Sequence, residues 1–209
     1  MLFPENLPPL LDGETLYSWC ARFHALSSSG NSRLTSRRIF GHPTAGLRTD
    51  FPVALDRLAE RTGLGSQHID EIIACHSVFP AFAPFLTDAR HAAIVAAMRA
   101  AEPARIKSAL GLPASRLGSP APLKGCPDCI REDRARYGTA IWHAELQFPG
   151  ILICSRHRMP AFPLSASEQR CASRDFMLPH QVRERTQEET WSPSEAAFET
   201  LAGLANWSR

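Results

Sequence analysis

The chain has 209 residues, 44% of them hydrophobic, and a formal net charge of +2 at pH 7. This length and composition allow one ordinary domain plus a small module, with enough apolar residues for a buried core. The near-neutral charge excludes a uniformly cationic nucleic-acid-binding protein, so contacts with DNA must come from local patches. We find no apolar run long enough to span a bilayer and no signal peptide at the start, and we therefore expect a cytoplasmic protein without a membrane partner.

The first two predicted elements are helices. Apolar residues at helical spacing predict a helix from about Thr15 to Leu26, capped by Asp12 or Thr15. A second helix is predicted from Arg33 to Phe40, where Gly41 is a natural C-cap. Three arginines on one side of the second helix are candidate contacts for DNA phosphates, with a merely solvated face as the alternative: Arg33, Arg37 and Arg38.

A pattern typical of a helix-turn-helix follows. We expect Asp50 to cap a helix that is entered through Pro52, and a second helix to open at Ser66 after a glycine turn. In such a pair a small residue lets the helices approach, a glycine forms the left-handed turn and an aliphatic residue locks the second helix; these are Ala59, Gly63 and Ile69. The second helix would then be a DNA-recognition helix, whose groove-facing candidates are Ser66, Gln67, His68 and Glu71.

The negative charge of the second helix favours a role other than DNA reading for this pair of helices. Asp70 and Glu71 place negative charge where phosphates would lie, and no Arg or Lys occurs between Arg61 and Arg90. The alternative to groove reading is therefore a helical hairpin that packs or binds a protein.

Two more helices complete the predicted helical part. Thr87 or Asp88 caps a helix to about Ala100, and a shorter helix runs from about Pro103 to Leu110. We predict a helical domain over residues 1–111, a linker over 112–124, a metal module over 125–165, and a polar connector with a carboxy-terminal helix over 166–209.

Two short motifs with metal-ligand spacing lie in the predicted module. Cys126 and Cys129 are separated by two residues, and so are Cys154 and His157. Each turn directs two ligands inward, and a Cys3His set is a standard closed site for one structural Zn²⁺ ion. A reducing compartment favours metal over disulfides, and we expect Cys20 and Cys75 to be buried hydrophobic residues and Cys171 a free thiol.

The segment between the two motifs predicts a zinc ribbon or treble-clef-like module. A helical turn over Ile130 to Tyr137 is followed by strand character over Thr139 to Phe148 and a short strand over Ile151 to Ile153. We interpret His143 as a packing or hydrogen-bonding residue. The expected core consists of Tyr137, Trp142, Phe148, Leu152 and Phe162, which could alternatively form a base-stacking surface.

These motifs resemble the TniQ/TnsD family of transposition target-selection proteins. The resemblance is carried by Pro8-Pro9-Leu10, Gly13-Glu14-Thr15-Leu16, Ser18-Trp19, Arg22, the two metal motifs, Tyr137-Gly138, Trp142-His143 and Phe148-Pro149-Gly150. It implies a mainly helical α+β fold with helix-turn-helix-like helices and a zinc ribbon. It also implies zinc ligands at Cys126, Cys129, Cys154 and His157.

The function that the resemblance implies is that of a non-catalytic adaptor. Such a protein connects target DNA, or a DNA-bound guide-RNA complex, to an AAA+ ATPase that regulates a transposase. In that role we expect arginines around the module to touch phosphates as well: Arg131, Arg134, Arg136, Arg156 and Arg158.

Two other functions remain as alternatives. A zinc-containing helix-turn-helix transcriptional regulator would read DNA through Ser66 to His76. An enzyme is disfavoured because four ligands close the metal site and because no P-loop or H-E-x-x-H motif is present. At the end of the chain, Ser165 to Glu189 is predicted to be a poorly packed connector. An amphipathic helix over Ser194 to Trp207 could dock back, pair two copies into a homodimer, or bind a partner.

Overall fold

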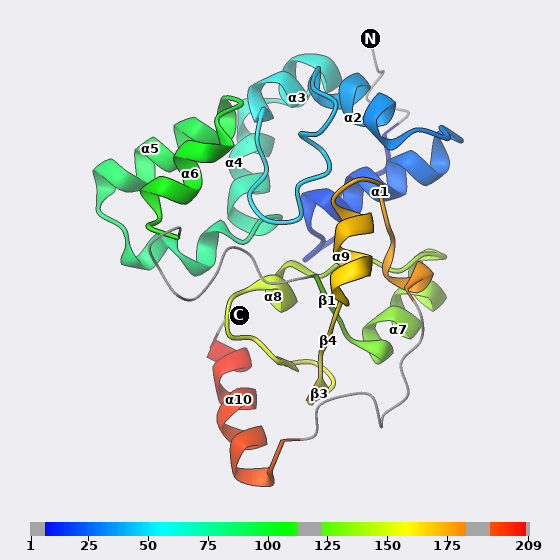
Figure 1. The fold of residues 1–209 in the computed structure, drawn as a ribbon, viewed down its shortest axis with the longest axis vertical. Coiled ribbons are helices and arrows are strands. Elements are labelled where there is room, and N and C mark those ends of the chain that lie inside the picture. Colours follow the sequence, from blue (N-terminus) through cyan, green and yellow to red (C-terminus); the bar gives the residue numbers. More distant parts are fainter. Residues whose placement is uncertain (1–6, 113–122, 183–192, 208–209) are drawn as a thin grey trace.

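The computed structural model describes residues 7–112, 123–182 and 193–207. Helices α1 to α6 form one half of the molecule, and the second half holds short strands, helices α7 to α9 and the carboxy-terminal helix α10 (Figure 1). The chain is thus mainly helical with a few short strands, as the sequence predicts. Within the described ranges, no helix is long and apolar enough to cross a membrane.

The first two helices form as predicted. Helix α1 covers Leu16–Leu26, and the Thr15 side chain caps it by accepting a hydrogen bond from the Ser18 backbone. Helix α2 covers Ser32–Phe40 and ends at Gly41, whose φ of 70° is the left-handed conformation that glycine adopts without strain.

Helices α3 (Leu55–Thr62) and α4 (Ser66–Cys75) are joined by a turn in which Gly63 has a φ of 74°. The predicted cap of the first helix is wrong. Ala54 is the N-cap, without a side-chain hydrogen bond, because the buried Asp50 forms an ion pair with Lys107 instead, at 3.0 Å.

Helices α5 (Asp88–Arg99) and α6 (Pro103–Ala109) pack against each other, and two 3-10 turns, η2 (Phe79–Ala81) and η3 (Ala83–Phe85), lead into them. The largest apolar core joins residues of α1 to α6. Its fully buried members include Leu55, Leu58, Ile69, Ile72 and Ile94. Cys20 lies in this core, but the prediction that Cys75 is buried is wrong, because its side chain is exposed at the end of α4.

The second half is built from helix α7 (Pro127–Tyr137) and two small antiparallel pairs. Strand β1 (Lys124–Gly125) pairs with β4 (Phe162–Pro163), and β2 (Ile153–Cys154) pairs with β3 (Met159–Pro160). The strand predicted over Thr139 to Phe148 is wrong: this segment contains the short helix α8 (Ala144–Gln147) and one isolated bridge at His143.

The expected core of the module is confirmed in part. Trp142 is fully buried and Phe162 is 6% exposed, whereas Leu152 is 41% exposed. Tyr137 and Phe148 are half-buried. Trp142 and Phe162 share an apolar cluster with Tyr17 of α1, so the core extends out of the module into the helical half.

The prediction of a poorly packed connector is wrong over the described residues up to 182. Helix α9 (Ala166–Ala172) begins with a capping box at Ser165, and η4 (Pro179–Gln181) follows. The Tyr17 hydroxyl donates to the Ala172 carbonyl at 3.0 Å and accepts from the Met177 backbone, so this segment is fixed to α1. Helix α10 (Glu195–Trp207) docks against β2, which is one of the three arrangements considered for it.

Candidate metal centre

The two predicted ligand pairs meet at one point. The sulfur atoms of Cys126, Cys129 and Cys154 and a ring nitrogen of His157 all lie within 4.8 Å of one another. The Cys129 and Cys154 sulfurs are 3.6 Å apart, and the His157 Nδ1 atom lies 3.4 to 3.6 Å from the three sulfurs. Tetrahedral bonds of about 2.3 Å to sulfur and about 2.0 Å to nitrogen require ligand separations of about 3.5 to 3.8 Å. The cluster therefore fits one metal ion.

Each ligand pair comes from a different element. Cys126 is the N-cap of α7 and Cys129 lies in its first turn, where the positive end of the helix dipole stabilises thiolates. Cys154 ends β2, and His157 lies in the turn toward β3, in which Arg158 has a φ of 49°. The Arg158 N–H donates to the Cys154 carbonyl at 2.8 Å and holds this turn closed.

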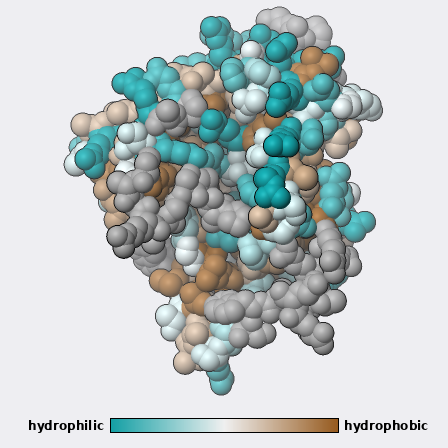
Figure 2. Space-filling model, in the orientation of Figure 1, coloured by the Kyte–Doolittle hydropathy of each residue, from teal (hydrophilic) through white to brown (hydrophobic). Residues whose placement is uncertain are grey.

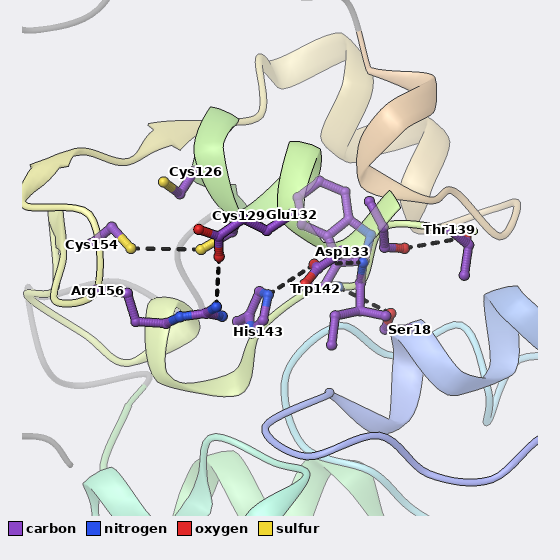
Figure 3. A network of polar contacts seen from close by, with 12 residues as sticks. Ser18, Cys126, Cys129, Glu132, Asp133, Thr139, Trp142, His143, Cys154 and Arg156 are labelled. Atoms are coloured by element: carbon purple, nitrogen blue, oxygen red, sulfur yellow. Dashed lines mark hydrogen bonds and ion pairs between the residues drawn. The ribbon is translucent and has the colours of Figure 1, made fainter. Parts of the chain in front are cut away.

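A carboxylate orients the histidine from outside the cluster. The His157 Nε2 atom lies 2.8 Å from the Glu132 carboxylate, which also forms an ion pair with Arg156 at 2.7 Å (Figure 3 shows the latter pair). A proton on Nε2 leaves Nδ1 free to bind a metal, and such a carboxylate fixes the tautomer of a metal-binding histidine. Glu132 was not among the predicted site residues, although its place three positions after Cys129 puts it one helical turn away.

The next residue of α7 connects the metal centre to the rest of the protein. The buried Asp133 carboxylate lies 2.9 Å from the His143 Nε2 atom and accepts from the Ile141 backbone at 3.3 Å (Figure 3). This bears out the interpretation of His143 as a hydrogen-bonding residue. Asp133 was also missed by the sequence reasoning, because its partner lies ten residues away across a loop.

The loop held by Asp133 forms the junction with the helical half. The Trp142 N–H donates to the Ser18 hydroxyl at 3.0 Å, and the Trp142 carbonyl accepts from the Thr15 backbone at 2.9 Å. The Ala144 N–H donates to the Gly13 carbonyl at 2.7 Å. We call these residues the junction: Gly13, Thr15, Ser18, Trp142 and Ala144. It joins the segment from Gly13 to Ser18 to the segment from Trp142 to Ala144 by hydrogen bonds, and the two segments lie more than a hundred residues apart in the sequence.

A buried ion pair supports the helical side of the junction. The Glu14 carboxylate lies 2.6 Å from an Arg22 nitrogen, and the same arginine donates to the Pro9 carbonyl. The Trp19 indole donates to the Pro8 carbonyl at 2.7 Å. Burial raises the pKa of Glu14, and the neighbouring Arg22 opposes that rise. The hydrogen bonds from Trp19 and Arg22 thus hold the proline-rich segment at Pro8 and Pro9 against α1.

A buried lysine holds the loop before β2 in place. The Lys124 ammonium donates to the Phe148 and Ile151 carbonyls at 2.8 and 2.6 Å, and it closes the loop before β2. Burial lowers the pKa of this lysine to about 8.

The TniQ family profile matches residues 7–160, which covers the N-terminal segment, the junction and all four candidate ligands. The chain belongs to the TniQ family. It is similar to the transposon Tn7 transposition protein TnsD of Escherichia coli, with 26% identity over 157 residues. That match covers 73% of this chain and 30% of TnsD, so this TniQ chain corresponds to less than a third of that relative.

The predicted DNA contacts of this TniQ chain lie in three places. Arg33, Arg37 and Arg38 are exposed on α2, and Ser66 and Gln67 are exposed at the start of α4, where His68 is half-buried. Around the metal, three of the five arginines are held by carboxylates: Arg131 by Asp128, Arg156 by Glu132 and Arg158 by Glu199. Arg134 and Arg136 are exposed on α7.

Proposed function

We propose that this TniQ protein is a non-catalytic adaptor in DNA transposition that selects the target. It would connect target DNA, or a DNA-bound guide-RNA complex, to an AAA+ ATPase that regulates a transposase. The observation that carries the proposal is the TniQ match, which runs through the helical half, the junction and the metal centre. The similarity to a transposition protein supports the same role.

The metal in this proposal is one structural Zn²⁺ ion. Three thiolates and one imidazole would complete a tetrahedron around it, which would leave no coordination position for water or substrate. The three cysteines are buried, and the outward nitrogen of His157 is engaged by Glu132. The four ligands would hold α7 against the β2–β3 hairpin. Asp133 of α7 would then hold the loop around Trp142 in place for the junction.

The proposed DNA contacts are exposed arginines, which bind phosphates and position a protein without reading sequence. The α2 arginines are the strongest candidates, because three of the module arginines already form ion pairs. A protein that acts on DNA in this way would work in the cytoplasm of its host cell.

A transcriptional regulator is the second candidate, and one observation favours it. Ser66 and Gln67 are exposed at the start of α4, the end that a recognition helix presents to the major groove. Against it, Glu71 is exposed on the same helix, and Asp70 is held by Arg99 at 2.7 Å. Sequence-selective binding that is lost in Gln67→Ala would favour the regulator.

The adaptor role can be tested by recovering the ATPase on the tagged protein. The neighbouring genes are first searched for an AAA+ ATPase. That ATPase is then mixed with the zinc-loaded protein, with Cys126→Ser, and with Cys171→Ser as the matched control. Cys171 is an exposed thiol outside the cluster, so its variant should keep both zinc and ATPase. We expect Cys126→Ser to lose zinc and most of the recovered ATPase, because metal binding is folding free energy in such a module. Failure of the wild-type protein to recover the ATPase would contradict the adaptor.

A further inference from the structure

One segment of the helical half contains no acidic residues. Between Glu14 and Asp50 the sequence contains no Asp or Glu, whereas it contains five arginines. One of these, Arg22, is buried in the ion pair with Glu14. Helix α2 lies in the middle of this acid-free stretch and carries three of the others.

Helix α2 separates its arginines from its packing residues. Its buried positions are Ser32, Thr35, Ser36, Ile39 and Phe40, which turn toward the protein. The exposed positions lie on the opposite side, where residues four apart are neighbours. Arg33, Arg37 and Arg38 therefore share one outward face. Figure 2 shows hydrophilic and hydrophobic side chains mixed over this part of the molecule, and Leu34 of the same helix is 44% exposed.

A fourth arginine joins this face from another helix. Arg61, in the last turn of α3, donates to the Arg38 carbonyl at 3.4 Å. Its guanidinium lies against Gly41, 3.1 Å from the point that a Cβ atom would occupy there. Arg61 is thus placed beside the end of α2, and the sequence patterns gave no reason to include it. We call Arg33, Arg37, Arg38 and Arg61 the α2 arginine face.

The α2 arginine face has no compensating carboxylate. Among the described residues, no Asp or Glu oxygen lies within 4.0 Å of any of its four side chains, whereas Arg57, Arg99 and Arg105 each have an acidic partner. Four uncompensated cations on one surface repel one another and attract a polyanion. Guanidinium groups also match phosphate oxygens in a bidentate geometry.

We propose that the α2 arginine face binds the phosphate backbone of duplex DNA, and that Arg61 is part of this contact. The inference rests on the proposed function, because it takes DNA as the polyanion that an adaptor in transposition meets. It gives α2 and the end of α3 the role of positioning the protein on DNA, in place of α4. Backbone contacts of this kind are independent of sequence and sensitive to salt.

The test measures binding of the zinc-loaded full chain to a short fluorescent duplex of arbitrary sequence at several salt concentrations. The patch variants are Arg33→Gln with Arg37→Gln, and Arg61→Gln alone. The matched control is Arg57→Gln with Arg105→Gln, which removes the same charge from exposed, ion-paired positions. Thermal unfolding of each variant shows that it is folded.

We expect the double patch variant to reduce the slope of log affinity against log salt by about 2, and Arg61→Gln to reduce it by about 1. The control should keep the wild-type slope. The inference is overturned if the wild type shows no salt-dependent binding, if the control loses as much as the patch variant, or if an RNA duplex competes better than DNA. Loss of ATPase recovery with this DNA binding intact would contradict the adaptor alone.

Discussion

The two halves of the molecule are held together in different ways. Helices α1 to α6 share a large apolar core, in which residues such as Leu58 and Ile72 are fully buried. Among the described residues, the metal half has smaller apolar clusters, and the ligand cysteines are three of the six buried members of one of them. The stability of the helical half should therefore depend on the volume of its buried side chains. The stability of the metal half should depend on the metal ligands and on the polar contacts of the junction. The TniQ match over residues 7–160 thus spans two halves that are stabilised in different ways.

The largest effect on the helical half is expected from a cavity in its core. Ile72→Ala should lower the free energy of unfolding by about 2 to 5 kcal/mol, because the buried side chain leaves a void between packed helices. Zinc content should stay unchanged, since no ligand contacts this position. Chemical denaturation and a zinc assay check both parts. Glu71→Ala, an exposed change on the same helix, should cost less than about 0.5 kcal/mol.

Release of the metal from Ile72→Ala at low denaturant would show that the metal half also depends on the apolar core of the helical half.

A smaller effect is expected at the junction. Ser18→Ala removes the hydroxyl that accepts from the buried Trp142 N–H, and an unpaired buried donor costs about 1 to 3 kcal/mol. Tryptophan fluorescence during chemical denaturation measures this loss. Ser173→Ala is the matched control, because its exposed hydroxyl donates to the nearby Arg170 carbonyl, outside the junction. Equal stability of the two variants would show that the junction contributes little.

The sequence predicted those parts of the structure that depend on near neighbours. Helix spacing and caps located α1 and α2, and helix spacing after a glycine turn located α4, since each is set by residues within a few positions. The spacing of the two residue pairs likewise predicts that Cys126, Cys129, Cys154 and His157 form one cluster. The two-residue turn between the members of each pair brings them together locally, so near neighbours in the sequence are enough to predict the cluster that the structure shows.

The features that the sequence did not show depend on distant partners. The Thr139 to Phe148 segment has strand-forming residues, but its backbone bonds to Gly13 and Thr15 rather than to a neighbouring strand of the module. Asp50 has the chemistry of a cap, but its carboxylate forms an ion pair with Lys107 of α6. Arg61 joins the α2 arginine face only because α3 packs beside α2.

We propose that the metal centre supports the junction, and hydrogen exchange with and without a strong chelator measures that support. After metal removal, we expect α7, the β2–β3 hairpin and the loop around Trp142 to lose protection, and α3 to α6 to keep it. Readdition of Zn²⁺ should restore the wild-type pattern. Unchanged protection of α7 and Trp142 in the metal-free protein would show that the metal does not support the junction.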